Sequence, residues 1–147
     1  MNISNLKTPI MLLISALWIV LLVLASTGHF VVGMVLSVPL MGLHFMLGVA
    51  KKGVVSKKFL IYPLLVWAIL FIVSFILCGY YADTFAGVLP SFTVFGMHPS
   101  FAPVIIGYWL GGLLTISLGY YLLQDEWLSQ KDWDEFCEEA KKIKEGR

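Results

Sequence analysis

Hydrophobic residues in this chain of 147 residues form long runs that charged residues interrupt at only a few points. Three stretches contain no Asp, Glu, Lys or Arg: residues 8–50, 59–82 and 84–124. A helix needs about 20 apolar residues to cross roughly 30 Å of hydrocarbon, so the first and third stretches are too long for one crossing. We therefore predict four membrane-spanning helices, at about residues 8–27, 30–50, 59–81 and 99–123.

The connection between the first two predicted helices consists of Gly28 and His29 alone. Glycine at this place can take the positive φ that ends a helix and lets the chain reverse. The pattern therefore predicts two helical hairpins. The expected fold is an all-α integral membrane protein, with a four-helix transmembrane domain over residues 1–124 and a separate tail over residues 125–147.

The composition supports a membrane class and excludes others. Hydrophobic residues make up 59% of the chain and charged residues only 13%, against about 25% charged residues in a typical soluble domain. A soluble core of this size cannot bury such runs, which excludes soluble enzyme folds. No basic face is present for nucleic acid. We expect membrane lipid around the helices, and no cofactor or metal.

The basic residues predict the orientation, because Lys and Arg near helix ends are retained on the cytoplasmic side. Lys7 precedes the first helix, the loop between the second and third helices is rich in lysine, and residues 125–147 contain the remaining five basic residues. None lies at Gly28-His29 or within residues 82–100. We predict a multi-pass protein of the cytoplasmic (inner or plasma) membrane with both termini in the cytoplasm.

Ionisable groups are nearly absent from the predicted spans, where a charge is costly and is usually kept for transport or catalysis. His44 is the exception, and Ser37 lies two turns before it on the same face of the second helix. One interpretation is a proton-sensitive or ligand-binding imidazole, since histidine titrates near neutral pH. The other is a neutral histidine that hydrogen-bonds to a neighbouring helix.

Small residues recur every four positions in the fourth predicted helix: Gly107, Gly111, Thr115 and Gly119. Such spacing lets another helix backbone approach closely, as in GxxxG packing, so these residues form a predicted helix-association face. The spacing allows a partner helix in this chain or in another protein.

The predicted external segment, residues 83–101, is too apolar for a loop in free water. It contains eight large apolar side chains among glycines and prolines. We expect it to rest on the bilayer surface or to fold back over the helices. The alternative is a docking surface for a larger subunit.

The tail carries a local signal for a helix. Ser129 and Asp132 match an S-x-x-D capping box, and Leu128 and Trp133 are spaced as a hydrophobic staple. An apolar stripe follows at helical spacing, which predicts a cytoplasmic amphipathic helix: Trp133, Phe136, Cys137, Ala140 and Ile143. Residues 131–147 have five basic and six acidic side chains, a poor match to anionic lipid. We expect Trp133, Phe136 and Ile143 to dock on another subunit or on this chain's own cytoplasmic loop.

The second half of the chain, from about Leu65 to Asp125, contains a helix with an early Trp and a Ser-Phe pair, followed by an apolar external stretch. A Phe-Gly-x-x-Pro-x-Phe motif comes next, and the last helix ends in Tyr and acidic residues; the residues concerned are Trp67, Ser74, Phe75, Phe95, Gly96, Pro99 and Phe101. This half resembles the small two-helix accessory subunits that pair with bacterial sodium:solute symporters. The resemblance implies a non-catalytic partner of a larger transporter and assigns no functional residues.

Together these patterns predict a small integral membrane protein that serves as a non-catalytic accessory or regulatory subunit of a larger membrane transporter. The alternative is a stand-alone small transporter or channel, working as a homo-oligomer with His44 in its pathway. We do not expect an enzyme, because four-helix membrane transferases usually carry charged groups near the lipid interface to bind a cofactor.

Overall fold

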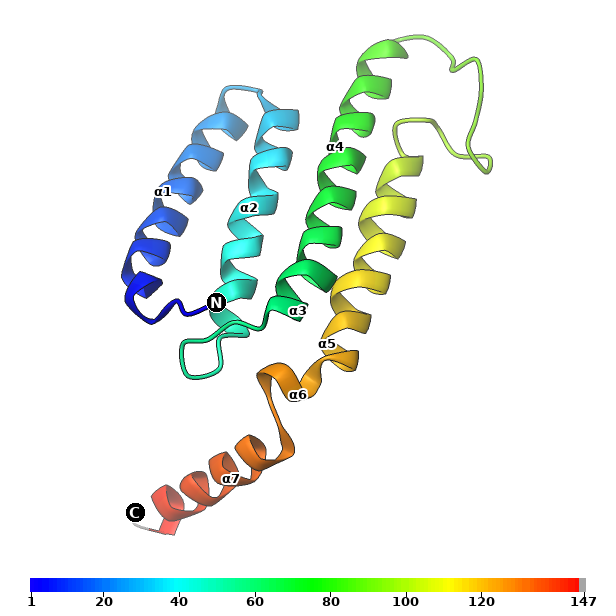
Figure 1. Cartoon of the computed structure of the whole chain (residues 1–147). Coiled ribbons are helices and arrows are strands. Elements are labelled where there is room, and N and C mark those ends of the chain that lie inside the picture. Colours follow the sequence, from blue (N-terminus) through cyan, green and yellow to red (C-terminus); the bar gives the residue numbers. More distant parts are fainter. Residues whose placement is uncertain (146–147) are drawn as a thin grey trace.

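The computed structural model describes residues 1–145 and is helical, with three isolated β-bridges and no strand in that range. Four helices are long and apolar enough to cross a membrane, as the hydrophobic pattern predicted. They lie in a row in Figure 1. A short turn, η1 (Ser4–Leu6), leads into α1 (Lys7–Ser26), and Thr27-Gly28-His29 connects α1 to α2 (Phe30–Gly48). Gly28 has a φ of +81°, the left-handed conformation expected for the reversal.

The third long helix combines α3 (Lys57–Phe59), η2 (Leu60–Leu65) and α4 (Val66–Thr84). It is interrupted at Tyr62, which is extended (φ −131°, ψ 121°) because the ring of Pro63 disfavours helical backbone in the residue before it. At this interruption the hydroxyl of Tyr62 donates a hydrogen bond to the carbonyl oxygen of Leu114, in the fourth long helix, at 2.8 Å.

The fourth long helix combines η3 (Val104–Leu110), η4 (Leu113–Ser117) and α5 (Leu118–Leu122), and is called here the η3–α5 helix. It contains widened, π-helical turns, in which Gly111 donates its backbone hydrogen bond to Ile106 and Leu118 donates to Leu113. A short α6 (Gln124–Trp127) and then α7 (Gln130–Glu145) follow. Residues 146–147 of the predicted tail lie outside the described residues.

The four long helices form an open row rather than a closed bundle. α1 packs on α2, α2 packs on α4, and α4 packs on the η3–α5 helix; α1 has no comparable contact with α4 or with the η3–α5 helix within residues 1–145. Ring contacts mark the second and third of these junctions: the ring centroids of Phe45 and Trp67 lie 5.3 Å apart, and those of Phe71 and Tyr108 lie 4.4 Å apart. α1 and the η3–α5 helix therefore form the two edges of the row.

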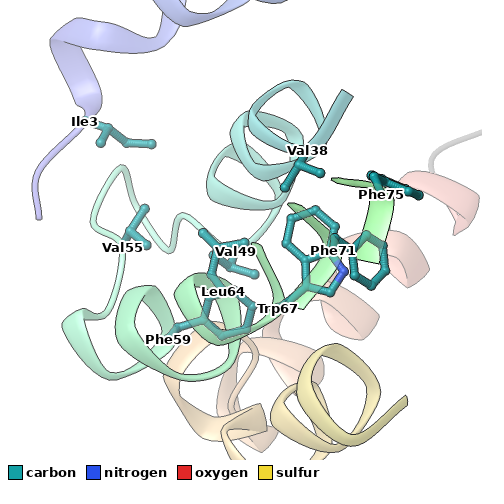
Figure 2. Packing of buried hydrophobic residues seen from close by; sticks show 9 residues of the cluster. All are labelled: Ile3, Val38, Val49, Val55, Phe59, Leu64, Trp67, Phe71 and Phe75. Carbon is teal, nitrogen blue, oxygen red and sulfur yellow. The ribbon is translucent and has the colours of Figure 1, made fainter. Parts of the chain in front are cut away.

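The buried apolar residues extend along α4 and continue into the loop between α2 and α3 (Figure 2). One part surrounds Trp67, which is 2% exposed and packs among Val38, Phe71 and Phe75. The other part joins the start of the chain to the loop, where Ile3 and Val55 are fully buried. Figure 2 shows Ile3 directed toward this loop.

The first residues of the chain pair with the loop between α2 and α3. Ile3 donates a backbone hydrogen bond to Gly53 at 2.8 Å, and Val55 donates one to Met1 at 2.8 Å. Gly53 has a φ of +81°, and a side chain there would collide with Ser4. The hydrophobic pattern of the sequence does not predict this pairing. It ties the residues before α1 to the loop that follows the C-terminal end of α2.

Candidate functional site

The structure places His44 and Ser37 on α2, each hydrogen-bonded to its own helix. His44 is exposed, and its Nδ1 lies 2.9 Å from the carbonyl oxygen of Leu40. A carbonyl oxygen only accepts hydrogen bonds, so Nδ1 carries the proton in this arrangement. Ser37 donates a hydrogen bond from its hydroxyl to the carbonyl of Met34 at 2.6 Å. Within residues 1–145, the hydrogen-bond partner of His44 therefore comes from its own helix and not from a neighbouring one.

Both residues line an open groove between α1 and α2, with a volume of about 480 Å³. The remaining lining residues are apolar or aromatic: Trp18, Leu21, Leu40, Met41 and Phe45. No carboxylate, lysine or arginine among residues 1–145 lines the groove, so an ion-coupled cycle there would have only the imidazole to exchange protons. Chemically, this groove suits an apolar chain or a helix surface with one polar group.

The small residues of the fourth long helix lie against the third long helix of the same chain. A Cβ atom built on Gly111 would lie 3.1 Å from Cδ1 of Leu70, and a Cβ on Gly107 would collide with the hydroxyl of Ser74. At the other end, a Cβ on Gly119 would collide with the ring of Pro63. These glycines therefore allow a close helix–helix approach within the chain.

Thr115, the fourth member of this face, is 4% exposed. It donates a hydrogen bond from its hydroxyl to the carbonyl oxygen of Gly111 at 2.6 Å, which satisfies the buried polar group within its own helix. Ser74 does the same on the facing helix through the carbonyl of Leu70, at 2.7 Å. The close approach between the two helices thus leaves neither of these buried hydroxyls without a partner.

The capping box at the start of α7 is confirmed by its hydrogen bonds. The backbone N–H of Ser129 donates to Oδ2 of Asp132 at 2.9 Å, and the hydroxyl of Ser129 donates to the same oxygen. The backbone N–H of Asp132 approaches the Ser129 hydroxyl at 3.4 Å. The pairing satisfies N–H groups that have no partner within the first turn of a helix.

Two ion pairs connect the loop and the start of the third long helix to the tail. Lys51 lies 2.5 Å from Oδ2 of Asp132, and its ammonium also donates to the hydroxyl of Ser129 at 3.3 Å. Lys58 lies 2.8 Å from Glu126. We call these four charged residues and Ser129 the loop–tail junction. α7 leaves the helical row from this junction (Figure 1).

The junction lowers the pKa of both of its carboxyl groups. The hydrogen bond from Lys51, followed by those from Ser129, holds the pKa of Asp132 well below its ordinary value of 3.8. The hydrogen bond from Lys58 lowers the pKa of Glu126, with a smaller contribution from Ser56. Both carboxylates are therefore charged throughout the neutral and mildly acidic range.

The large apolar residues of α7 stay exposed although the start of that helix is held. Trp133 is 49% exposed, Phe136 is 59% exposed and Ile143 is 71% exposed. The rings of Trp133 and Phe136 lie 5.8 Å apart. The contact of the tail with the loop thus runs through Asp132 and Ser129, and not through these three side chains.

Sequence reasoning missed the residues that join distant parts of the chain. Lys51 and Asp132 are separated by 81 positions, and the only signal for their pairing was the excess of lysine in the loop and of acids in the tail. Tyr62 carried no signal at all for its bond to the η3–α5 helix. Within residues 1–145, no group of three or more His, Cys, Asp or Glu side chains is placed to hold a metal ion.

Comparisons of the chain with known protein families, with curated proteins and with solved structures found no match.

Proposed function

We propose that this chain is a small integral membrane protein that acts as a non-catalytic accessory or regulatory subunit of a larger membrane transporter. In this proposal the four long helices cross the cytoplasmic membrane, and both termini and the loop–tail junction lie in the cytoplasm. The distribution of basic residues supports the orientation, because the loop, the start of the third long helix and the tail contain nine of the ten.

The observation that carries the proposal is the open row of helices. α1 and α2 together bury only Ile14, Val38 and Leu40. A second apolar groove, of about 540 Å³, lies between α1, α2 and the third long helix. The hairpin therefore borders two grooves, this one and the groove beside His44. An open row of this kind, over residues 1–145, offers a wide apolar surface to another membrane protein, which is why we place the pathway outside this chain.

The missing charges support a non-catalytic role in the same way. Residues 8–50, 59–82 and 84–124 contain no acidic or basic side chain except histidine. A chain that couples transport to an ion would normally keep a carboxylate within the membrane. We therefore place the substrate pathway in the partner and not in this chain.

We propose that the exposed face of α7, with Trp133, Phe136 and Ile143, is the cytoplasmic part of the contact. This helix is amphipathic by sequence, and its balanced charge favours protein over anionic lipid. The loop–tail junction would present this face in one orientation, which reduces the entropy lost on docking. The resemblance of residues 65–125 to symporter accessory subunits suggests a sodium:solute symporter as the class of partner.

The test is to tag the chain at its C-terminus, extract it from its native membrane in a mild detergent, and identify the co-purifying proteins by mass spectrometry. We expect a larger transport protein in fixed stoichiometry with the wild-type chain. Trp133→Asp should reduce its recovery several-fold, because the change places a charge in the docking face.

The matched control is Lys141→Gln, which makes the same change in net charge on another face of α7. It should leave the recovery of the partner unchanged. The proposal is contradicted if the chain purifies as a homo-oligomer alone, or if Trp133→Asp changes neither the partner's recovery nor the abundance of this chain in the membrane.

A second candidate function follows from the groove that brings His44 and Ser37 together with Trp18. A homo-oligomer whose copies close this groove would form a pathway with the imidazole in its wall. In vesicles that contain only this protein, His44→Ala should then abolish flux. Flux that survives His44→Ala would exclude this role for the residue.

A further inference from the structure

The segment that connects α4 to the η3–α5 helix exposes large apolar side chains. Residues 84–97 contain no Asp, Glu, Lys or Arg. Leu89 is 94% exposed and Phe95 is 88% exposed, the highest values among the large hydrophobic residues of the described chain. Such exposure is unfavourable in water, so contact with a nonaqueous environment would stabilise these two side chains.

An aromatic cluster holds the rest of this segment against the end of α4. Tyr81 and Phe85 stack with centroids 6.3 Å apart, and the ring of Phe92 lies 5.8 Å from Tyr81 and 5.9 Å from Phe85. His98 lies edge-on to Phe85 at 6.0 Å. These rings pack with one another, while Leu89 and Phe95 are left outside the cluster.

A tight turn carries Phe95 at its tip. Val94 and Met97 exchange two backbone hydrogen bonds of 3.0 Å, and the residues between them, Phe95 and Gly96, have φ values of +51° and +76°. Glycine adopts this conformation readily, whereas a bulky residue rarely does. The turn therefore holds Phe95 in a backbone conformation that glycine or asparagine would adopt more readily.

We propose that Leu89 and Phe95 insert into the lipid leaflet on the side of the membrane opposite to the loop–tail junction. The inference rests on the membrane insertion proposed above, since a loop between two spanning helices lies at the bilayer surface. In Figure 1 this loop bends back beside the first turns of the η3–α5 helix instead of projecting beyond α4. Phe101 and Ile106 are exposed there too, so the apolar surface continues from the loop onto the helix.

Lipid fits this surface better than a protein partner does. Protein interfaces surround their apolar centre with a polar rim that includes charged groups. Residues 84–97 offer only the hydroxyls of Thr84, Ser91 and Thr93 among their side chains. Asp83 and His98 flank this stretch, so the ionisable groups lie at its ends, and Phe and Leu side chains are what interfacial segments bury at the edge of the hydrocarbon.

The test measures the depth of nitroxide labels in vesicles of phosphatidylcholine and phosphatidylglycerol. The two native cysteines are removed by Cys78→Ala and Cys137→Ala, and single labels are attached through Leu89→Cys or Phe95→Cys. Two reference labels are added: Leu113→Cys in the middle of the η3–α5 helix, and Asp125→Cys beyond its end. Collisions with oxygen report the hydrocarbon, and collisions with a water-soluble nickel complex report water.

We expect the labels at positions 89 and 95 to collide with oxygen more than with nickel, as the label at 113 does. The inference is overturned if they behave like the label at 125 while 113 remains oxygen-rich, or if both are shielded from both reagents, which would indicate a protein cover. A nickel-accessible label at 113 would instead contradict the proposed membrane insertion itself. Leu89→Cys keeps the test valid if Phe95→Cys alters its turn.

Discussion

The α1–α2 hairpin and the pair formed by α4 and the η3–α5 helix are both helical hairpins of apolar sequence, but they pack very differently. The hairpin buries only Ile14, Val38 and Leu40 within its two helices, and open grooves lie beside it as they also do beside the pair. In the pair, glycines lie against Leu70 and Ser74 of α4 and, below them, against Pro63 of η2, and tilted aromatic rings contact one another between the helices. Apolar content alone therefore does not decide how tightly two helices pack; small residues and rings in register do.

The difference also suggests a division of roles within the row. The α4 pair has the close glycine contacts of a structural platform, whereas the α1–α2 hairpin buries fewer side chains; both regions also expose apolar side chains that a partner or lipid would cover. Loss of packing should consequently be severe in the pair and mild in the hairpin. The changes below test this, starting with the largest expected effect.

Removing a tryptophan should separate the two regions most clearly. Trp67, at 2% exposure, packs on Phe45 and Phe71, whereas Trp18 of α1 is 51% exposed. We expect Trp67→Ala to lower the free energy of unfolding by about 3 kcal/mol, because it leaves a cavity. Trp18→Ala should change it by less than about 0.5 kcal/mol. Unfolding by SDS in mixed micelles, followed by circular dichroism, measures both; equal losses would contradict the division.

Filling a glycine position should act in the same direction. Gly119→Leu forces a side chain into the ring of Pro63, and overpacking of this kind costs about 2 kcal/mol. Gly42→Leu in α2 is the control, because no atom lies within 4 Å of the Cβ position there. The same unfolding assay should show a loss for the first variant and none for the second. A stable Gly119→Leu protein would mean that the close approach is not required.

The smallest effect concerns the tail and depends on pH. The pKa of Asp132 is lowered in the folded state, so its contribution is complete above its ordinary pKa of 3.8 and is lost as the pH falls through the lower, folded value. A nitroxide on Cys137, in a Cys78→Ala background, should keep its mobility constant from pH 8 to pH 5. Its mobility should rise only in strongly acidic solution.

Asp132→Asn should raise the label's mobility already at pH 7, because the variant loses the ion pair with Lys51. Lys131→Gln is the control: Lys131 pairs with Glu135 at 3.8 Å between exposed side chains, and such a pair contributes little. A rise in wild-type mobility between pH 8 and pH 5 would show that a group other than Asp132 holds the start of α7.

Much of the fold could be read from local sequence, and the site residues much less. The four long helices follow from charge-free runs, and the capping box follows from two residues three positions apart. His44 was recognised as the unusual polar residue of the second helix, but the groove that it shares with Trp18 depends on how α1 and α2 pack. Their apolar residues surround each helix on all sides, so no sidedness was available to predict the contact.

The sequence by itself therefore determined the number of apolar helices, the reversal at Gly28 and the start of α7, because each depends on residues within one or two turns. Only the tertiary structure decided that the helices form an open row, that Gly107 to Gly119 face the third long helix, and that Lys51 reaches Asp132. The glycine contacts and the ion pair join residues 33 to 81 positions apart. Their geometry follows from the shapes of facing surfaces, which no local periodicity encodes.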